Sequence, residues 1–312
     1  MANVWDADVE ITPDGMIRRI ERQFPELVPV RLEPLGVGWD NVAVLVNGRW
    51  VFRFPRRRVA AALIEREARV LPLLAPHLPL PIPVPRFRGA PGDDYPYPFS
   101  GYARLPGVTA CRAALTDAAR ADLAVPLARF LAALHRVPVD DELLTGAGAH
   151  GDDIGRTDLP ARAVVAKERL HGVAPALAAA GIDAGPLPGL IDRLAAATPP
   201  HAGPPCWVHG DLYARHLLVD ADTRRPCGVI DWGDVHLGDP ALDLSIAWSF
   251  LPPGAPRNAF RVEYGAINGA TWDRARFRAL HYGPILVRYG IDTGDDAIRE
   301  AGEFALRAAA TY

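Results

Sequence analysis

The sequence predicts an α+β protein of two lobes, a small β-rich N-terminal lobe and a larger, mainly helical C-terminal lobe. Apolar runs on both sides of an Asn-Gly pair predict a β-hairpin, whereas from residue 117 onward apolar residues recur mostly at helical spacing. We expect the boundaries 1–102 for the N-terminal lobe, 103–107 for a strand-like connection and 108–312 for the C-terminal lobe. A cleft between two such lobes is a natural ligand site.

Local patterns predict each element of the N-terminal lobe. In residues 32–54, VAVLV and RWVFRF flank Asn-Gly and predict two strands, with the preceding GVG as a flexible turn. Residues 59–78, VAAALIEREARVLPLLAPHL, carry apolar side chains at helical spacing. The proline-rich stretch 79–89 predicts an extended link, because proline disrupts helix interiors. Residues 99–107, FSGYARLPG, predict a strand that runs into a turn.

The C-terminal lobe is predicted to be helical on both sides of a short β-rich stretch. Residues 117–137 have one apolar helix face, whereas the Gly- and Asp-rich stretch 140–160 predicts a loop. The polar turn 207–216 precedes two short strands, LLVD and CGVID. Further helices are expected in ALDLSIAWSFL, in NAFRVEYGAI and in a run from Trp272 onward.

Composition argues against several classes of function. The formal net charge of -3 gives no support to a nucleic-acid partner. Cys111, Cys206 and Cys227 are widely spaced without a CxxC pair, which favours a reduced protein without disulfides or a zinc site. No apolar run reaches the roughly 18 residues that span a membrane, and the acidic N-terminus lacks the core of a signal peptide. We expect a cytoplasmic protein, with its oligomeric state open.

Phosphoryl transfer needs cations at the phosphates, carboxylates that hold a metal ion, and a group that orients the attacking hydroxyl. Asp211 lies in the polar turn of WVHGDLYARHLLVD, where it would accept a proton from the acceptor hydroxyl or orient it. Asp231 ends the apolar strand GVI and begins DWG, a position that suits a Mg²⁺ ligand. Arg53 in WVFRF would touch phosphates, with Glu65 or Glu67 of the next helix as its ion-pair partner.

Taken one at a time, these residues also have structural interpretations. Asp211 alone would be a turn-capping aspartate, Arg53 a strand arginine that extends to solvent, and Glu67 part of a solvated helix face. The one lysine of the chain, Lys167, follows VVA rather than a glycine-rich turn, which excludes a Walker A loop. The combination of Asp211 in HGD with Asp231 in DWG favours the catalytic interpretation.

The block HGDLYARHLLVD followed by GVIDWGDVHLGDPALDLS strongly resembles the aminoglycoside phosphotransferase superfamily of antibiotic kinases, which has a protein-kinase-like fold. HGD is similar to the kinase HRD, DWG to DFG, and WVFR to the strand motif VAIK, with Arg53 in place of the lysine. EREARVL resembles the helix with the paired glutamate, which implies Glu67 rather than Glu65. The resemblance covers roughly residues 32–250.

The resemblance implies further roles. FSGYARLPG is similar to the hinge, so the Ala103 carbonyl and the Leu105 N–H would hold the nucleobase of ATP or GTP. Asp239 and Asp243 in GDPALDLS would cap the following helix and brace the loop. His209 is expected to hold the loop through packing and hydrogen bonds rather than to act in catalysis.

His216 stands where the kinase loop has an asparagine. It would bind Mg²⁺ together with Asp231, bond to a phosphate, or hold the turn, and we favour a metal or phosphate contact. The histidine in HGDxxxxH and the FRFPRR run after the hairpin are similar to the macrolide kinases within the superfamily. Outside these motifs, Asp152 and Asp153 are expected in a solvated loop, although a substrate-facing role is an alternative, and His135 is expected to end a helix.

The C-terminal segment bears on the acceptor. Residues 260–312 carry seven arginines and seven acidic residues, whereas a polycationic aminoglycoside would favour an acidic pocket. Its aromatic residues suit a bulky, mostly apolar acceptor, although a helical core explains them equally well. We expect a kinase that transfers the γ-phosphate of ATP or GTP to a hydroxyl of an antibiotic, with a macrolide-like acceptor favoured. The alternatives are an aminoglycoside or other small-alcohol kinase, and a non-catalytic, pseudokinase-like nucleotide-binding module.

Overall fold

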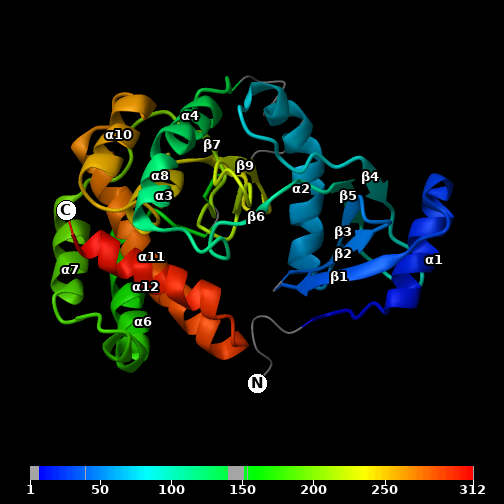
Figure 1. Ribbon diagram of the computed structural model, residues 1–312, viewed down its shortest axis with the longest axis horizontal. Helices are drawn as coiled ribbons and strands as arrows, with labels where there is room; N and C mark the ends of the chain where they lie inside the picture. Colours follow the sequence, from blue (N-terminus) through cyan, green and yellow to red (C-terminus); the bar gives the residue numbers. More distant parts are fainter. Residues whose placement is uncertain (1–6, 39, 140–150, 153, 312) are drawn as a thin grey trace.

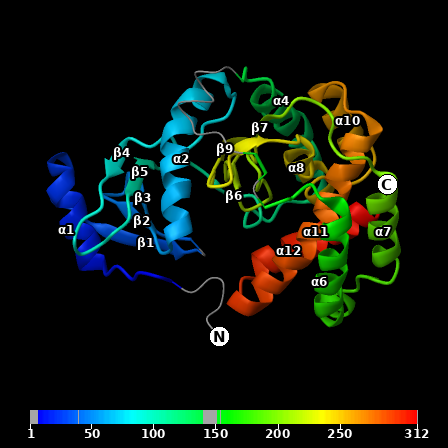
Figure 2. The same ribbon diagram turned by 180° about the vertical axis from the view of Figure 1, so that it is seen from behind.

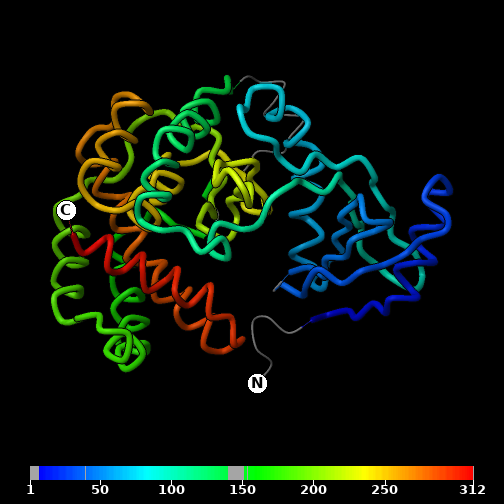
Figure 3. The backbone as a smooth tube through the Cα atoms, in the orientation of Figure 1, coloured from blue at the N-terminus to red at the C-terminus, as the bar shows by residue number. Residues whose placement is uncertain are grey.

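The computed structural model describes residues 7–38, 40–139, 151–152 and 154–311. It consists of a smaller β-rich part and a larger helical part (Figure 1), which confirms the predicted α+β class. Figure 3 shows the chain passing from the smaller to the larger part in the segment after β5. The boundary at 102 stays a prediction, and the last strand of the smaller part ends at Ala103.

One five-stranded antiparallel sheet, in the order β1-β2-β3-β5-β4, forms the smaller part. In both ribbon views α2 lies between this sheet and the larger part (Figures 1 and 2). The elements are α1 (Pro13–Gln23), η1 (Pro25–Leu27), β1 (Leu32–Val37), β2 (Asn41–Val46), β3 (Trp50–Pro55), α2 (Arg58–Leu74), η2 (Ala75–His77), β4 (Phe87–Gly89) and β5 (Phe99–Ala103).

The predicted hairpin is present as β2 and β3. The two strands pair antiparallel, and the residues Val46 and Trp50 close the ladder next to the turn. Asn47 and Gly48 have φ values of 52° and 66°, and this left-handed backbone at both turn residues is what the Asn-Gly pair favours. The hairpin also fixes the position of Arg53, which lies buried in β3.

The prediction that GVG forms a turn before VAVLV holds for Gly38, which precedes β2, but not for Gly36 and Val37, which lie in a further strand. Residues 32–37 form β1, which pairs with β2 and has a register shift between Pro34 and Gly36. Most of β1 is exposed, so its own apolar pattern gives no strand signal, and the strand is held by backbone pairing with β2. The chain bends after it, where the Gly38 N–H donates to the Asn41 carbonyl at 2.9 Å.

The larger part is helical around two small sheets, β10-β7 and β6-β8-β9. Strands β8 and β9 confirm the prediction for LLVD and CGVID. Strands β7 and β10 were not predicted, because three residues are too few to show the alternation of side chains in a strand. The elements are β6 (Val108–Thr109), α3 (Asp117–Asp122), α4 (Ala124–His135), α6 (Leu159–Ala179), α7 (Leu187–Ala197), β7 (Cys206–Val208), β8 (Leu217–Val219), β9 (Pro226–Val229), β10 (His236–Gly238), α8 (Ala241–Leu244), α9 (Ile246–Ser249), α10 (Ala255–Tyr264), α11 (Gly269–Thr293) and α12 (Asp296–Ala310).

Helix α11 is the central helix of the larger part. It packs against α12 and α6 (Figure 2), and many of its side chains are buried. The Asn268 side chain caps its start by accepting the Thr271 N–H at 2.8 Å, and Gly294 ends it in a left-handed conformation with φ of 67°. Within the described residues, no helix has the length and apolar character to cross a membrane.

Two glycines, one in the sheet of the smaller part and one in α6, give a matched test of how tightly the protein is packed. A Cβ at Gly89 in β4 would lie 2.2 Å from the buried ring of Phe99, whereas a Cβ at Gly172 in α6 meets nothing within 4 Å. Gly89→Ala is expected to lower the free energy of unfolding by about 1–3 kcal/mol through overpacking. Gly172→Ala is expected to raise it by up to about 1 kcal/mol through helix propensity. Urea denaturation measures both, and equal stability of the two variants would contradict the predicted packing.

Candidate active site

The backbone of the polar turn between β7 and β8 is shaped by a glycine. Gly210 has φ of +80°, and a Cβ there would lie 2.6 Å from the Asp234 carbonyl oxygen, so a larger residue does not fit. Asp243, fully buried in α8, accepts the backbone N–H of His209 at 2.7 Å and that of Gly210 at 2.9 Å. The turn is therefore tied to α8, which supports the predicted bracing role of Asp243.

Both ring nitrogens of His209 are used within the protein. Nε2 lies 3.0 Å from the Ile230 carbonyl oxygen, which only accepts, so Nε2 carries the proton. Nδ1 accepts the Asp211 N–H at 3.2 Å. Burial lowers the pKa of His209 below its ordinary value, and the ring is therefore neutral. These contacts fit a histidine that holds the loop.

Further side-chain contacts surround this brace, and of these the sequence indicated only the helix cap by Asp239. His135, the last residue of α4, places Nε2 3.2 Å from Oδ2 of Asp243. Asp239 accepts the Nε–H of Arg274 at 2.5 Å and the Ala241 N–H at 2.9 Å, so it caps the start of α8. His135 does end a helix, as expected, but its ring is committed to the carboxylate that holds the turn.

A buried arginine joins the two parts of the molecule. Nη1 of Arg53 in β3 donates to both carboxylate oxygens of Glu67 in α2, at 2.8 and 2.7 Å. Nη2 of the same guanidinium donates to Oδ1 of Asp231, which follows β9, at 3.2 Å. Glu65, the second candidate partner, is exposed on the other side of α2. Arg53, Glu67 and Asp231 are thus brought together from three elements.

The charges of this group follow from its burial and its contacts. Burial would lower the pKa of Arg53, but Glu67 and Asp231 raise it above its ordinary value. Burial raises the pKa of Glu67 to about 7, against the opposing effect of Arg53. Burial would also raise the pKa of Asp231, but Arg53 and His216 hold it well below its ordinary value. Arg53 and Asp231 are therefore charged at neutral pH.

Asp231 and His216 face each other across the turn. Asp231 has φ of +64°, a left-handed conformation that aspartate tolerates better than most residues, and 51% of its side chain is exposed. Nδ1 of His216 donates to the Asp211 carbonyl oxygen at 2.7 Å, and Nε2 lies 3.3 Å from Oδ2 of Asp231. Burial would lower the pKa of His216, but Asp231 and Asp211 raise it above its ordinary value.

The donor set around Asp231 fits a metal ion that arrives with phosphates. In the part of the chain that the structure describes, no group of three His, Cys, Asp or Glu side chains is arranged to hold a metal ion by itself. Mg²⁺ is typically held by one or two carboxylates, with phosphates and waters as the other ligands. The half-exposed carboxylate of Asp231 suits that role. Nε2 of His216 is directed at the same carboxylate, although Mg²⁺ prefers oxygen over imidazole nitrogen.

On the opposite side, a tyrosine of α11 contacts Asp211. The hydroxyl of Tyr282 donates to Oδ1 of Asp211 at 2.5 Å. The Tyr282 ring meets the Tyr213 ring edge-on at 5.5 Å, and Tyr213 in turn meets the His216 ring at 4.4 Å. Leu286 in α11 belongs to the same apolar cluster. The sequence indicated Tyr282 only as one of many aromatic residues, because nothing local relates it to HGD.

Arginines surround this aromatic side of the site. The guanidinium of Arg278 lies over the Tyr282 ring, with Cζ 4.6 Å from its centre. Arg169 of α6 donates to Nε2 of His281 at 3.2 Å, which requires a neutral imidazole. Arg156 forms an ion pair with Asp234, three residues after Asp231. The side of Asp211 away from Arg53 therefore carries positive side chains and is not uniformly acidic.

The remaining predicted residues lie apart from this group. Ala103 is exposed at the end of β5, and Leu105 is half-buried beside Gly228 in β9. Asp152 pairs with Nη1 of Arg156 at 3.2 Å, so it is not simply solvated, while Asp153 lies outside the described residues. The contacts of Ala103 and Leu105 with a nucleobase stay a prediction.

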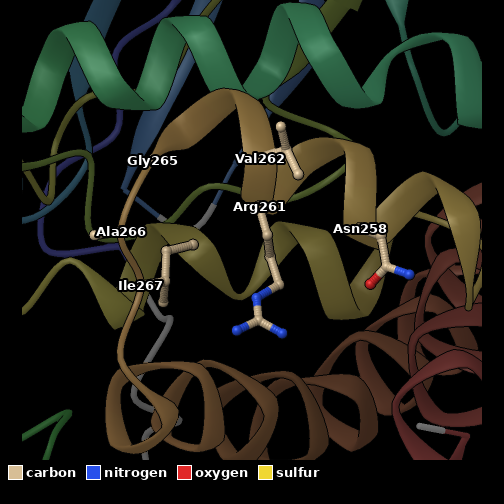
Figure 4. A pocket seen from close by; sticks show the side chains of 6 residues that line it. All are labelled: Asn258, Arg261, Val262, Gly265, Ala266 and Ile267. Carbon is tan, nitrogen blue, oxygen red and sulfur yellow. The ribbon is translucent and has the colours of Figure 1, made fainter.

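A surface pocket beside the end of α10 contains none of these residues (Figure 4). Its lining consists of Asn258, Arg261, Val262, Gly265, Ala266 and Ile267. It offers no carboxylate or histidine for phosphoryl transfer. The candidate site around Asp211 and Asp231 therefore lies outside this pocket.

Comparisons with known proteins agree with this geometry. A sequence model described as "Phosphotransferase enzyme family" matches residues 31–280, more than half of the chain. Viomycin phosphotransferase from Streptomyces vinaceus is 33% identical over 208 residues, which is 65% of this chain and 68% of that protein.

Solved structures show the same fold. The GDP complex of wild-type aminoglycoside 2'-phosphotransferase-IIIa superposes with a TM-score of 0.69 at 26% identity, over 96% of this chain and 99% of that one. The apoenzyme of macrolide 2'-phosphotransferase MphH from Brachybacterium faecium gives a TM-score of 0.60 at 26% identity, over 94% and 98% of the two chains. The bilobal protein-kinase-like fold that the resemblance implied is confirmed.

The neutral His281 makes stability depend on pH. Burial, reinforced by Arg278, Arg169 and Arg162, lowers its pKa to about 3, whereas in the unfolded chain it titrates near the ordinary value of about 6.5. Below that pH the unfolded state binds the proton and the folded state does not, so stability is lost as pH falls. At pH 5 we expect this histidine to cost about 2 kcal/mol relative to pH 7.

Chemical denaturation of the wild type and His281→Gln at pH 7, 6 and 5 measures the pH-dependent contribution of His281 to the free energy of unfolding. The variant is expected to lose about 2 kcal/mol less than the wild type over that range, whatever its stability at pH 7. The same pH slope in both proteins would show that His281 titrates normally in the folded state.

Proposed function

The chain belongs to the phosphotransferase enzyme family, and we propose that it transfers the γ-phosphate of ATP or GTP to a hydroxyl of a small-molecule antibiotic. The observation that carries this proposal is the grouping of Asp211, Asp231 and Arg53 from three separate elements. His216 connects them, because it contacts both aspartates. A base, a metal-binding carboxylate and a cation for phosphates within one site are what phosphoryl transfer requires.

Asp211 is the proposed base. Its carboxylate would accept the proton of the acceptor hydroxyl as the oxygen attacks the γ-phosphate. Burial raises the pKa of this carboxyl above its ordinary value, although His216 opposes the shift, and a raised pKa makes a carboxylate a better proton acceptor. The brace formed by His209 and Asp243 fixes the backbone that carries it.

Arg53, Asp231 and His216 form the proposed donor side. Arg53, held by both oxygens of Glu67, would present its remaining N–H groups to the phosphates. Asp231 would hold Mg²⁺, and His216 would be a second contact once Nε2 has lost its proton, because a protonated imidazole has no free lone pair. When bound, Mg²⁺ neutralises charge on the phosphates. The nucleobase would bond to the backbone of Ala103 and Leu105, and GDP in the complex of the related aminoglycoside enzyme supports a purine nucleotide donor.

A macrolide-like acceptor is favoured by the surroundings of Asp211. Tyr213, Tyr282 and Leu286 offer apolar surface for a bulky acceptor. Arg278 and the other arginines beside them disfavour a polycation, which an aminoglycoside site would attract with acidic residues. The similarity to a macrolide 2'-phosphotransferase is compatible with this choice. Because other relatives are named for aminoglycosides and viomycin, those compounds are the alternatives to test.

A panel of macrolides, aminoglycosides and viomycin, incubated with ATP or GTP and Mg²⁺, tests the proposal by mass spectrometry. We expect a macrolide to gain one phosphoryl group. Asp211→Asn is expected to lower kcat by at least about 100-fold while ADP binding, measured by calorimetry, is unchanged. Phosphorylation of another class would refute the macrolide choice alone, whereas full turnover by Asp211→Asn would refute the mechanism.

A further inference from the structure

The two oxygens of the Asp211 carboxylate have different surroundings. Oδ1 accepts the Tyr282 hydroxyl at 2.5 Å. Oδ2 lies 3.7 Å from Nδ1 of His216, beyond hydrogen-bonding distance, and the proton on Nδ1 is donated to the Asp211 carbonyl. The side chain keeps 21% of its surface exposed although Oδ1 is engaged. One oxygen is thus fixed by the protein, and the other has no hydrogen-bond donor among the described residues.

We propose that Tyr282 is a positioning residue for phosphoryl transfer, which holds Oδ1 of Asp211 so that Oδ2 is directed to the acceptor hydroxyl. The proposal rests on the proposed function. In the step, the acceptor oxygen forms a bond to the γ-phosphorus while the bond to the leaving nucleoside diphosphate breaks. The hydroxyl proton passes to Oδ2, and Tyr282 keeps its own proton throughout.

The Tyr282 hydroxyl is suited to donate a hydrogen bond to Asp211 throughout the reaction. A hydrogen bond to a charged carboxylate is among the stronger ones in proteins, and it restricts rotation of the carboxylate about its last bond. Burial raises the pKa of Tyr282 well above its ordinary value, so the hydroxyl stays protonated at every pH at which the protein would work. The same arrangement, a base oriented by a third group, is the common pattern of activated catalytic groups.

The ring of Tyr282 is itself held in place. Arg278, one helical turn earlier on α11, covers its face, and Tyr213 of the polar turn between β7 and β8 packs against it edge-on. The next residue, Gly283, allows α12 to approach, because a Cβ there would lie 2.7 Å from Cγ of Leu306. Tyr282 is therefore fixed between the turn that carries Asp211 and the α11–α12 pair.

A different role would give the opposite kinetics. If the Tyr282 hydroxyl occupied the place of the acceptor hydroxyl, the acceptor would have to displace it from Asp211. Removing the hydroxyl would then lower KM for the acceptor and leave kcat unchanged or higher. A positioning role instead predicts a fall in kcat with little change in KM, because the interaction matters most in the transition state.

Tyr282→Phe removes the hydroxyl and keeps the ring. We expect kcat for the phosphorylated acceptor to fall at least about tenfold, with KM for the acceptor and for the nucleotide within about twofold of the wild type. Tyr289→Phe is the matched control. Tyr289 lies two turns further along α11 and packs against the same cluster, but its hydroxyl bonds to Arg215 rather than to Asp211. This control is expected to keep the wild-type kcat.

Several results would overturn the proposal. An unchanged or increased kcat in Tyr282→Phe with a lower acceptor KM would show that the Tyr282 hydroxyl occupies the place of the acceptor hydroxyl and must be displaced. Equal losses in both tyrosine variants, accompanied by equal losses of thermal stability, would indicate a packing role. If the wild type phosphorylates no acceptor, the proposed function fails separately. The variants are then compared in nucleotide hydrolysis, where water replaces the acceptor, and an unchanged rate in Tyr282→Phe would still overturn the positioning role.

Discussion

The site depends on one guanidinium that is shared between two carboxylates. Arg53 reaches Glu67 with one nitrogen and Asp231 with the other, and so it fixes β3, α2 and the segment after β9 relative to one another. Taking such charges out of water is costly unless every partner is present. A lysine ammonium is a single point of charge, whereas the flat guanidinium has donors for two separate carboxylates. An arginine at this position therefore does more than preserve a positive charge.

The polar turn between β7 and β8 adds backbone constraints to this ionic one. Gly210 is required by the nearby Asp234 carbonyl, and Asp231 adopts a left-handed conformation. Strained or unusual backbone persists only where the surroundings enforce it. Asp243 of α8 holds the backbone at Gly210 by accepting the N–H groups of His209 and Gly210. The result is that Asp211 and Asp231 present their carboxylates on either side of His216.

Local patterns in the sequence were enough to predict the elements that depend mainly on their own residues. The Asn-Gly hairpin, the helix that carries Glu67 and the HGD and DWG turns could all be located from their own residues. The strand β1 was missed because its pairing with β2, rather than its own pattern, defines it. Tyr282 contacts Asp211 from 71 residues away, and His135 contacts Asp243 from 108 residues away. Such contacts depend on how helices pack, which the spacing of motifs does not reveal.

Magnesium-dependent binding of ADP tests most directly whether Asp231 is the metal ligand of a nucleotide site. Calorimetric titrations of ADP, with and without Mg²⁺, would be compared between the wild type and Asp231→Asn. We expect Mg²⁺ to tighten ADP binding at least about tenfold in the wild type, or about 1.4 kcal/mol, and to have little effect in the variant. An equal effect of Mg²⁺ in both proteins would contradict the assignment of Asp231.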